Sequence, residues 1–408
     1  MRLILMLIAG IVAGIVVGLF APLGLVRGIA TFQHTFSQFI SFVIPLLIFF
    51  FIAEAIANLN YGAGKILGWT TGISYVSTLG AGALAAFVGL KVIPMLSLTS
   101  SFETVKAIAI IPYIKLDLLP VMGVMTALVM AFIWGIGVAK TKAAIMRQAL
   151  SEGKRIIDGV ISYIIIPLLP LYIGSLFVEM TIAGEVVATL RTFGLVLCIA
   201  VGLHLVWLFT LYAVAASVAR VNVFTAMKNM LPAYLTAVGT MSSVATIPVT
   251  LRQTLKNNVD EDVADFVVPL CATIHMSGSM ITLTISSIAV MLLTQGILPT
   301  WGLLIPFILM LAVTMVAAPG MPGGTVMAAL GLFSSMLGFS EAAVGLMITL
   351  YVAQDSFGTA CNVTGDGAIA LIVNKIGRKD RYVGDDPKHV SWQVNITQPA
   401  AENLEKRA

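Results

Sequence analysis

The sequence predicts an all-α polytopic membrane protein with about eight transmembrane helices and two re-entrant helical hairpins related by inverted repeats. Composition is the first reason: of 408 residues, 59% are hydrophobic and only 10% are charged, whereas soluble domains carry about 25% charged residues. Recurring apolar runs of about 20 residues, the length of a spanning helix, are the second reason. The third reason is the arrangement of helix-breaking residues in the second half of the chain.

The first half contains uninterrupted apolar runs, which we interpret as spanning helices at 3–20, 37–57, 66–90, 118–139, 158–181 and 187–219. The first run is too long and too rich in glycine for a secretory signal peptide, and no small-residue cleavage site follows it. Three cysteines, Cys198, Cys271 and Cys361, lie within apolar segments without metal-ligand spacing, which is typical of small buried hydrophobic residues.

Two later apolar segments are interrupted and are each followed by an apolar helix that contains polar residues. The interruptions are Thr240-Met241-Ser242-Ser243 and Pro248 within 222–256, and Ala318-Pro319-Gly320-Met321-Pro322-Gly323-Gly324 within 301–338. Proline and clustered glycine break the helical hydrogen-bond ladder. Irregular backbone at membrane depth must be surrounded by protein or a water-filled cavity, a condition that re-entrant hairpins meet. A broken segment followed by a polar helix (262–294 and 341–375), occurring twice, is typical of repeated halves that meet at a central site.

The distribution of basic residues predicts that both termini are cytoplasmic. With the N-terminus inside, the cytoplasmic segments hold Arg2, Lys65, Lys140, Lys142, Arg147, Lys154, Arg155, Arg220, Lys228, Arg252, Lys256 and the basic residues of the tail, whereas the outer side holds Arg27, Lys91, Lys106, Lys115 and Arg191. This asymmetry follows the positive-inside rule. The first hairpin then opens from the cytoplasm and the second from outside. Because the basic residues lie in connecting loops, the net charge of +4 does not indicate a nucleic-acid partner.

One polar stripe in the last apolar helix points to function. On a helix, Asp355, Thr359, Asn362 and Asp366 share one face, with a carboxylate at each end of the stripe. Ionisable residues at membrane depth are costly and by default indicate a functional site, although a structural pair satisfied by neighbouring helices is the alternative. The run Asn362-Val363-Thr364-Gly365-Asp366 also weakens the helix locally, as ion coordination by backbone carbonyls requires.

On these motifs, the chain resembles the dicarboxylate/amino acid:cation symporter family, which includes excitatory glutamate transporters, neutral amino acid exchangers and bacterial serine/threonine symporters. The segments that carry the resemblance are Met241-Ser242-Ser243-Val244-Ala245-Thr246-Ile247-Pro248-Val249-Thr250, His275-Met276-Ser277-Gly278-Ser279, Ala318-Pro319-Gly320-Met321-Pro322-Gly323 and Asn362-Val363-Thr364-Gly365-Asp366. The last of these matches the family's sodium motif without change. The second stands where the family usually has Asn-Met-Asp-Gly-Thr.

The resemblance implies a substrate site and sodium sites. Asp355, assisted by Thr359, would pair with a substrate α-ammonium, and Asn362 with Ser243 would meet the α-carboxylate. The same resemblance adds Ser279, Gly358 and Met321 to the substrate site. Asp366 would coordinate transported Na⁺ with Asn362 and backbone carbonyls, and Thr273 with carbonyls of the second hairpin would hold another sodium ion. Met276 and His275 complete the implied sodium set.

The resemblance also implies a division of the chain. Residues 1–60 and 95–185 would form a scaffold, 61–94 and 186–375 a transport domain, and 376–408 a flexible cytoplasmic tail. The implied assembly is a homotrimer in the lipid bilayer of the plasma membrane, with the first, second, fourth and fifth spans forming the scaffold.

Departures from the family pattern bear on the substrate. The family's arginine for an acidic substrate side chain is Gly358 here, and the arginine that some members have in the first hairpin is Met241. An unpaired second carboxylate at this depth would be prohibitive, so we expect small neutral amino acids such as serine, threonine or alanine. The run Gln354-Asp355-Ser356 is similar to the serine/threonine symporters. Ser277 replaces an aspartate of the third sodium site.

Several alternatives stay open at this stage. His275 is either a hydrogen-bonded interior histidine or a residue that makes coupling sensitive to pH or partly proton-driven. A carrier of dicarboxylates or acidic amino acids, a proton-coupled carrier and a channel are further possibilities. An intramembrane protease would also need paired aspartates, but Asp366 follows Val363-Thr364-Gly365 and lacks the expected Gly-x-Gly-Asp. We therefore expect a transporter and not an enzyme.

Overall fold

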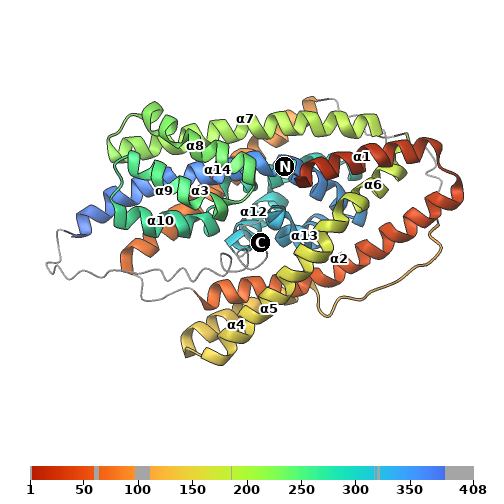
Figure 1. Ribbon diagram of the computed structural model, residues 1–408, viewed down its shortest axis with the longest axis horizontal. Helices are drawn as coiled ribbons and strands as arrows, with labels where there is room; N and C mark the ends of the chain where they lie inside the picture. Colours follow the sequence, from red (N-terminus) through yellow and green to blue (C-terminus); the bar gives the residue numbers. More distant parts are fainter. Residues whose placement is uncertain are drawn as a thin grey trace, which may run out of the picture.

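The computed structural model describes residues 2–58, 64–96, 111–184, 186–316, 318 and 322–381, and all regular structure within these ranges is helical (Figure 1). The early helices are α1 (Arg2–Phe20), α2 (Leu23–Ala57), α3 (Gly64–Met95) and α4 (Val124–Thr141). The fourth predicted span was placed too early, because residues 111–123 contain no regular helix. Pro120 disfavours helical backbone in the residue before it, and Gly123 is extended, at φ −68° and ψ 154°, directly before α4.

The fifth predicted span, 158–181, is the second half of a longer helical stretch. This stretch consists of α5 (Ala144–Val160), the π-helical turn η1 (Ile161–Ile165) and α6 (Ile166–Ile182). Helix α7 (Val186–Ala219) follows. By length and hydropathy, six helical stretches of the described residues can cross a membrane, namely Leu23–Ala57, Lys65–Met95, Val124–Thr141, Ala144–Ile182, Val186–Ala219 and Glu261–Gln295.

Both predicted interruptions are present, and each divides its segment into two packed helices. The first segment forms α8 (Val223–Thr240) and α9 (Ser243–Lys256), and the second forms α12 (Trp301–Val316) and α13 (Gly324–Leu337). Met241 ends α8 in the left-handed region at φ 52°, and the Ser242 hydroxyl then accepts from the Ala245 N–H, which caps α9. The prediction that Pro248 also interrupts the first segment is wrong, because Pro248 lies inside α9.

The segment predicted as one helix at 262–294 is broken in its middle. It consists of α10 (Glu261–Ile274) and α11 (Ser277–Gln295), with His275 in an extended conformation at φ −99° and ψ 102°. Neither glycine nor proline stands at this break, so local sequence gave no signal for it. The last helix, α14 (Glu341–Arg381), continues past the predicted end near 375, and residues 382–408 of the predicted tail lie outside the described residues.

The helices form two groups with the second hairpin between them (Figure 1). Helix α1 packs on α6, and α2 packs on α4 and α5, whereas α14 packs against α7, α8, α10 and α11. Helix α11 is buried along nearly its whole length and packs on α3 as well as on α14. The prediction of an all-α polytopic membrane protein is confirmed. This arrangement places the broken α10–α11 junction directly against the polar stripe of α14.

Candidate functional site

All four residues of the polar stripe on α14 are buried. Asp355 is 3% exposed and Asp366 is fully buried, with Thr359 and Asn362 between them. The Thr359 hydroxyl donates to Asp355 Oδ1 at 3.3 Å. Because buried carboxylates require partners, the neighbours of each carboxylate define what the two ends of the stripe can do.

Asp355 faces the second hairpin. Its Oδ2 accepts from the Gly323 N–H at 2.7 Å, at the point where the chain enters α13. Gly323 has φ 74°, which glycine adopts without steric cost. A movement of the second hairpin would therefore break or form this hydrogen bond and change the surroundings of the Asp355 carboxylate.

Asn362 caps the broken end of α11. Its Oδ1 accepts from the Gly278 N–H at 2.7 Å and from the Ser279 N–H at 3.4 Å, while its Nδ2 donates to Ser279 Oγ at 3.1 Å and to Met276 Sδ at 3.6 Å. The first N–H groups of a helix have no partner within the helix. Asn362, which belongs to α14, therefore supplies the hydrogen-bond acceptor for the N–H groups at the broken start of α11.

This cap depends on close backbone contact between two glycines. A Cβ atom added to Gly278 would overlap the carbonyl oxygen of Gly358, so only glycine fits at 278. A Cβ atom added to Gly358 would meet Thr282 Oγ1 at 3.5 Å and Ser279 N at 3.6 Å, which are ordinary contacts. Position 358 therefore faces a neutral, polar wall of α11.

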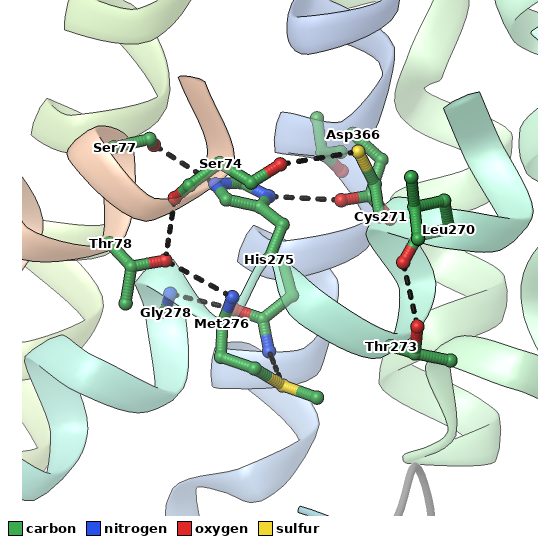
Figure 2. A network of polar contacts seen from close by, with 12 residues as sticks. Ser74, Ser77, Thr78, Leu270, Cys271, Thr273, His275, Met276, Gly278 and Asp366 are labelled. Atoms are coloured by element: carbon green, nitrogen blue, oxygen red, sulfur yellow. Dashed lines mark hydrogen bonds and ion pairs between the residues drawn. The ribbon is translucent and has the colours of Figure 1, made fainter. Parts of the chain in front are cut away.

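Asp366 forms the other end of the stripe and contacts His275 (Figure 2). His275 Nδ1 lies 2.9 Å from Asp366 Oδ1, and His275 Nε2 lies 2.9 Å from the Ser77 hydroxyl of α3. His275 is therefore a hydrogen-bonded interior histidine, and it also lies against the predicted sodium ligand. Asp366 Oδ2 finds no hydrogen-bond partner within the described part of the chain. A buried carboxylate oxygen in this situation suits a hard cation such as Na⁺, which takes oxygen ligands.

Two predicted site residues are not brought into the stripe. Thr273 is exposed, its hydroxyl donates to the Leu270 carbonyl at 2.7 Å, and Figure 2 shows it turned away from Asp366. Ser243 is buried in the first turn of α9, but it makes no hydrogen bond to the stripe among the described residues. Met321 lies outside the described residues.

Two contacting residues were missed by the sequence analysis. Tyr351 is four residues before Asp355 and is buried against the same site, and its hydroxyl lies 3.0 Å from Ser279 Oγ. Ser77, Ser74 and Thr78 lie at helical spacing in an apolar span, and Ser77 contacts His275. Tyr351 could have been found as a polar residue on the same face of α14 as the stripe. Ser77 could have been found as one of several polar residues at helical spacing in another apolar span.

Fold and site together define a polytopic membrane protein with a buried polar centre between broken helices. A profile of the sodium:dicarboxylate symporter family matches residues 3–376. The chain belongs to this family, as the motifs had predicted, and the family consists of transporters. This membership excludes the intramembrane protease.

Excitatory amino acid transporters are among the similar proteins. The chain is 31% identical over 236 residues to excitatory amino acid transporter 3 of Mus musculus, which covers 56% of this chain and 43% of the relative. It is 31% identical over 180 residues to excitatory amino acid transporter 5 of Homo sapiens, covering 44% and 32% respectively. The corresponding values for human excitatory amino acid transporter 2 are 28% over 181 residues, 44% and 31%. The match thus spans less than half the length of these relatives.

The glycine contact yields a test of stability. Gly278→Ala should destabilise the protein by about 1–3 kcal/mol, because the added methyl group overlaps backbone that cannot move without displacing α14. Gly358→Ala is the matched control and should leave the unfolding temperature in detergent almost unchanged. Equal unfolding temperatures for the two variants would show that the close contact is not required.

Proposed function

We propose that this protein is a sodium-coupled secondary transporter that carries small neutral amino acids, such as serine, threonine or alanine, by alternating access. The observation that carries the proposal is the buried stripe with a carboxylate at each end: Asp355 faces the second hairpin, and Asp366 presents an oxygen without a hydrogen-bond partner among the described residues. Family membership and the similarity to excitatory amino acid transporters support the reaction class.

The substrate end of the stripe suits an α-amino acid. Asp355 would accept the α-ammonium together with Thr359, and the amide of Asn362, at the positive N-terminal end of α11, would meet the α-carboxylate. Ser279 would line the same space, and Ser243 and Met321 would approach from the two hairpins. Gly358 faces the uncharged Thr282 and Ser279, so a second carboxylate would have no cation there.

The sodium end would use Asp366 with backbone carbonyls. Asn362 donates to Met276 Sδ, another residue of the proposed sodium set. Because Asn362 also belongs to the proposed substrate site, its side chain would be shared by the two ends of the stripe. Thr273 with carbonyls of the second hairpin would form another sodium site after a rearrangement that turns its hydroxyl inward. Ser277 in place of an aspartate favours fewer bound sodium ions than the full family motif allows.

The helix groups support a division of the proposed transporter into two parts. Helices α1, α2 and α4–α6 would form the scaffold of a homotrimer in the plasma membrane, with both termini cytoplasmic. Helix α3 and α7–α14 would form the transport domain. The packing of α1 on α6 and of α14 on α7, α8, α10 and α11 supports this division.

A proton-coupled carrier is the second candidate, and the contact between His275 and Asp366 favours it. A proton-coupled carrier needs a group that can hold a proton beside its coupling carboxylate, and His275 Nδ1 lies 2.9 Å from Asp366 Oδ1. Such a carrier would show uptake that follows a pH gradient, ignores sodium and changes in His275→Asn.

Charge selectivity is the first test of the substrate. Serine should be taken up at least about a hundredfold better than aspartate at equal concentration, because a second carboxylate would be buried without a cation. Gly358→Arg should shift preference toward aspartate, while Gly358→Gln, of similar length without charge, should not. Strong uptake of aspartate or succinate by the wild-type protein would instead identify a carrier of acidic substrates.

The role of Asp355 is tested by Asp355→Asn, which keeps the shape and removes the charge. Loss of one partner of a buried ion pair costs roughly 3–5 kcal/mol, so serine affinity should fall more than about a hundredfold. Binding measured by titration calorimetry checks this result. Asp117→Asn, which changes an exposed aspartate outside the stripe, is the control. An unchanged serine affinity in Asp355→Asn would remove the ammonium assignment.

The role of Asp366 is tested by linkage between the two ligands. Sodium should raise serine affinity, and serine should raise sodium affinity by the same factor, because the coupling free energy is shared. Asp366→Asn retains an oxygen for His275 and should abolish both effects while the protein stays folded. If sodium still strengthened serine binding in this variant, the coupling site would lie elsewhere.

A further inference from the structure

Tyr351 lies beside Asp355 at the proposed substrate end, although it was not among the predicted site residues. It is 1% exposed and precedes Asp355 by one turn of α14. Its hydroxyl lies 3.0 Å from Ser279 Oγ of α11 and is also in polar contact with Thr325 of α13 and with Asp355. A single hydroxyl thus joins three helices at the proposed substrate site.

The hydrogen-bonding capacity of a hydroxyl fixes the direction of these contacts. A tyrosine hydroxyl has one donor and two acceptor positions, whereas an ionised carboxylate only accepts. Tyr351 therefore donates to Asp355, and it accepts from the hydroxyls of Ser279 and Thr325. The donor and both acceptor positions of the hydroxyl are then used.

The remaining contacts of Asp355 show what this donation does. Thr359 donates to Oδ1 and the Gly323 N–H donates to Oδ2, so Tyr351 adds a third donor to a carboxylate that is buried among uncharged groups. Ser279, which donates to Tyr351, also accepts from Asn362 Nδ2 at 3.1 Å. Hydrogen bonds therefore join Asn362 to Ser279 and Ser279 to Tyr351, and the polar contact of Tyr351 with Asp355 extends this series to the carboxylate.

We propose that Tyr351 is a positioning residue that orients the Asp355 carboxylate for the substrate ammonium and holds it in register with Asn362. This inference rests on the proposed function, because it assigns Asp355 to the amino group of an amino acid. It adds a substrate-orienting role to a side chain that carries no charge itself. Tyr351 is also the only tyrosine among the described residues whose hydroxyl contacts Asp355.

Tyr351→Phe removes the hydroxyl and keeps the ring. Hydrogen bonds to charged groups are stronger than neutral ones, so the dissociation constant for serine should rise at least about tenfold. The apparent sodium affinity without amino acid, measured by thermal stabilisation, should change less than about twofold, because Tyr351 reaches Asn362 only through Ser279 and its contacts among the described residues do not include Asp366. Tyr172→Phe is the matched control: Tyr172 is equally buried, and its hydroxyl contacts the Glu341 carbonyl at 3.4 Å, away from the stripe.

The outcomes separate this inference from the proposed function. Unchanged serine affinity in Tyr351→Phe, or an equal loss of serine and sodium affinity, would overturn the positioning role. If Tyr351→Phe does not fold, Thr325→Val removes one partner of the hydroxyl, and a selective loss of serine affinity is again expected. If the wild-type protein binds an acidic amino acid, only the proposed selectivity for neutral amino acids is contradicted. The affinities of the wild-type protein and Tyr351→Phe would then be compared with that acidic amino acid. If it binds no amino acid, both proposals fail.

Discussion

The site depends on the amide of Asn362, which caps a helix that is broken at membrane depth. The break between α10 and α11 leaves N–H groups of Gly278 and Ser279 without helical partners, and Asn362 Oδ1 accepts from both. Without this partner, buried backbone groups would carry the full cost of desolvation. The cap requires α14 to touch α11, which the glycine contact between 278 and 358 permits. The positions of Asp355 and Asp366 follow, since both lie on the same helix as Asn362.

The two carboxylates differ because their neighbours differ. Asp355 is surrounded by uncharged donors from the second hairpin, Thr359 and Tyr351, and in the proposed transporter it would pair with a cationic group of the substrate. Asp366 shares one oxygen with His275 and presents the other to the interior. Because one helix carries both carboxylates, a ligand at one end can alter the other through α14 and the hairpin it contacts. This physical connection is what coupled transport needs.

The fold class, both hairpin interruptions and the stripe could be predicted from the sequence, because hydropathy, proline with glycine, and helical spacing are local signals. The break at His275 could not, because it depends on contacts of His275 with Asp366 and Ser77 and on the cap by Asn362. Pro248 shows the opposite case, a local helix breaker that the surrounding structure accommodates. The inward or outward direction of Thr273 and the contacts of Tyr351 likewise depend on which helices pack together, which spacing alone does not specify.

The most direct test of the central claim is uptake of radiolabelled serine into proteoliposomes with an imposed inward sodium gradient. Serine should accumulate inside above its external concentration, and this accumulation should cease when potassium replaces sodium on both sides. A channel would equilibrate serine without accumulating it. Accumulation that is independent of sodium, or absence of any concentrative uptake, would contradict a sodium-coupled transporter built on the stripe of α14.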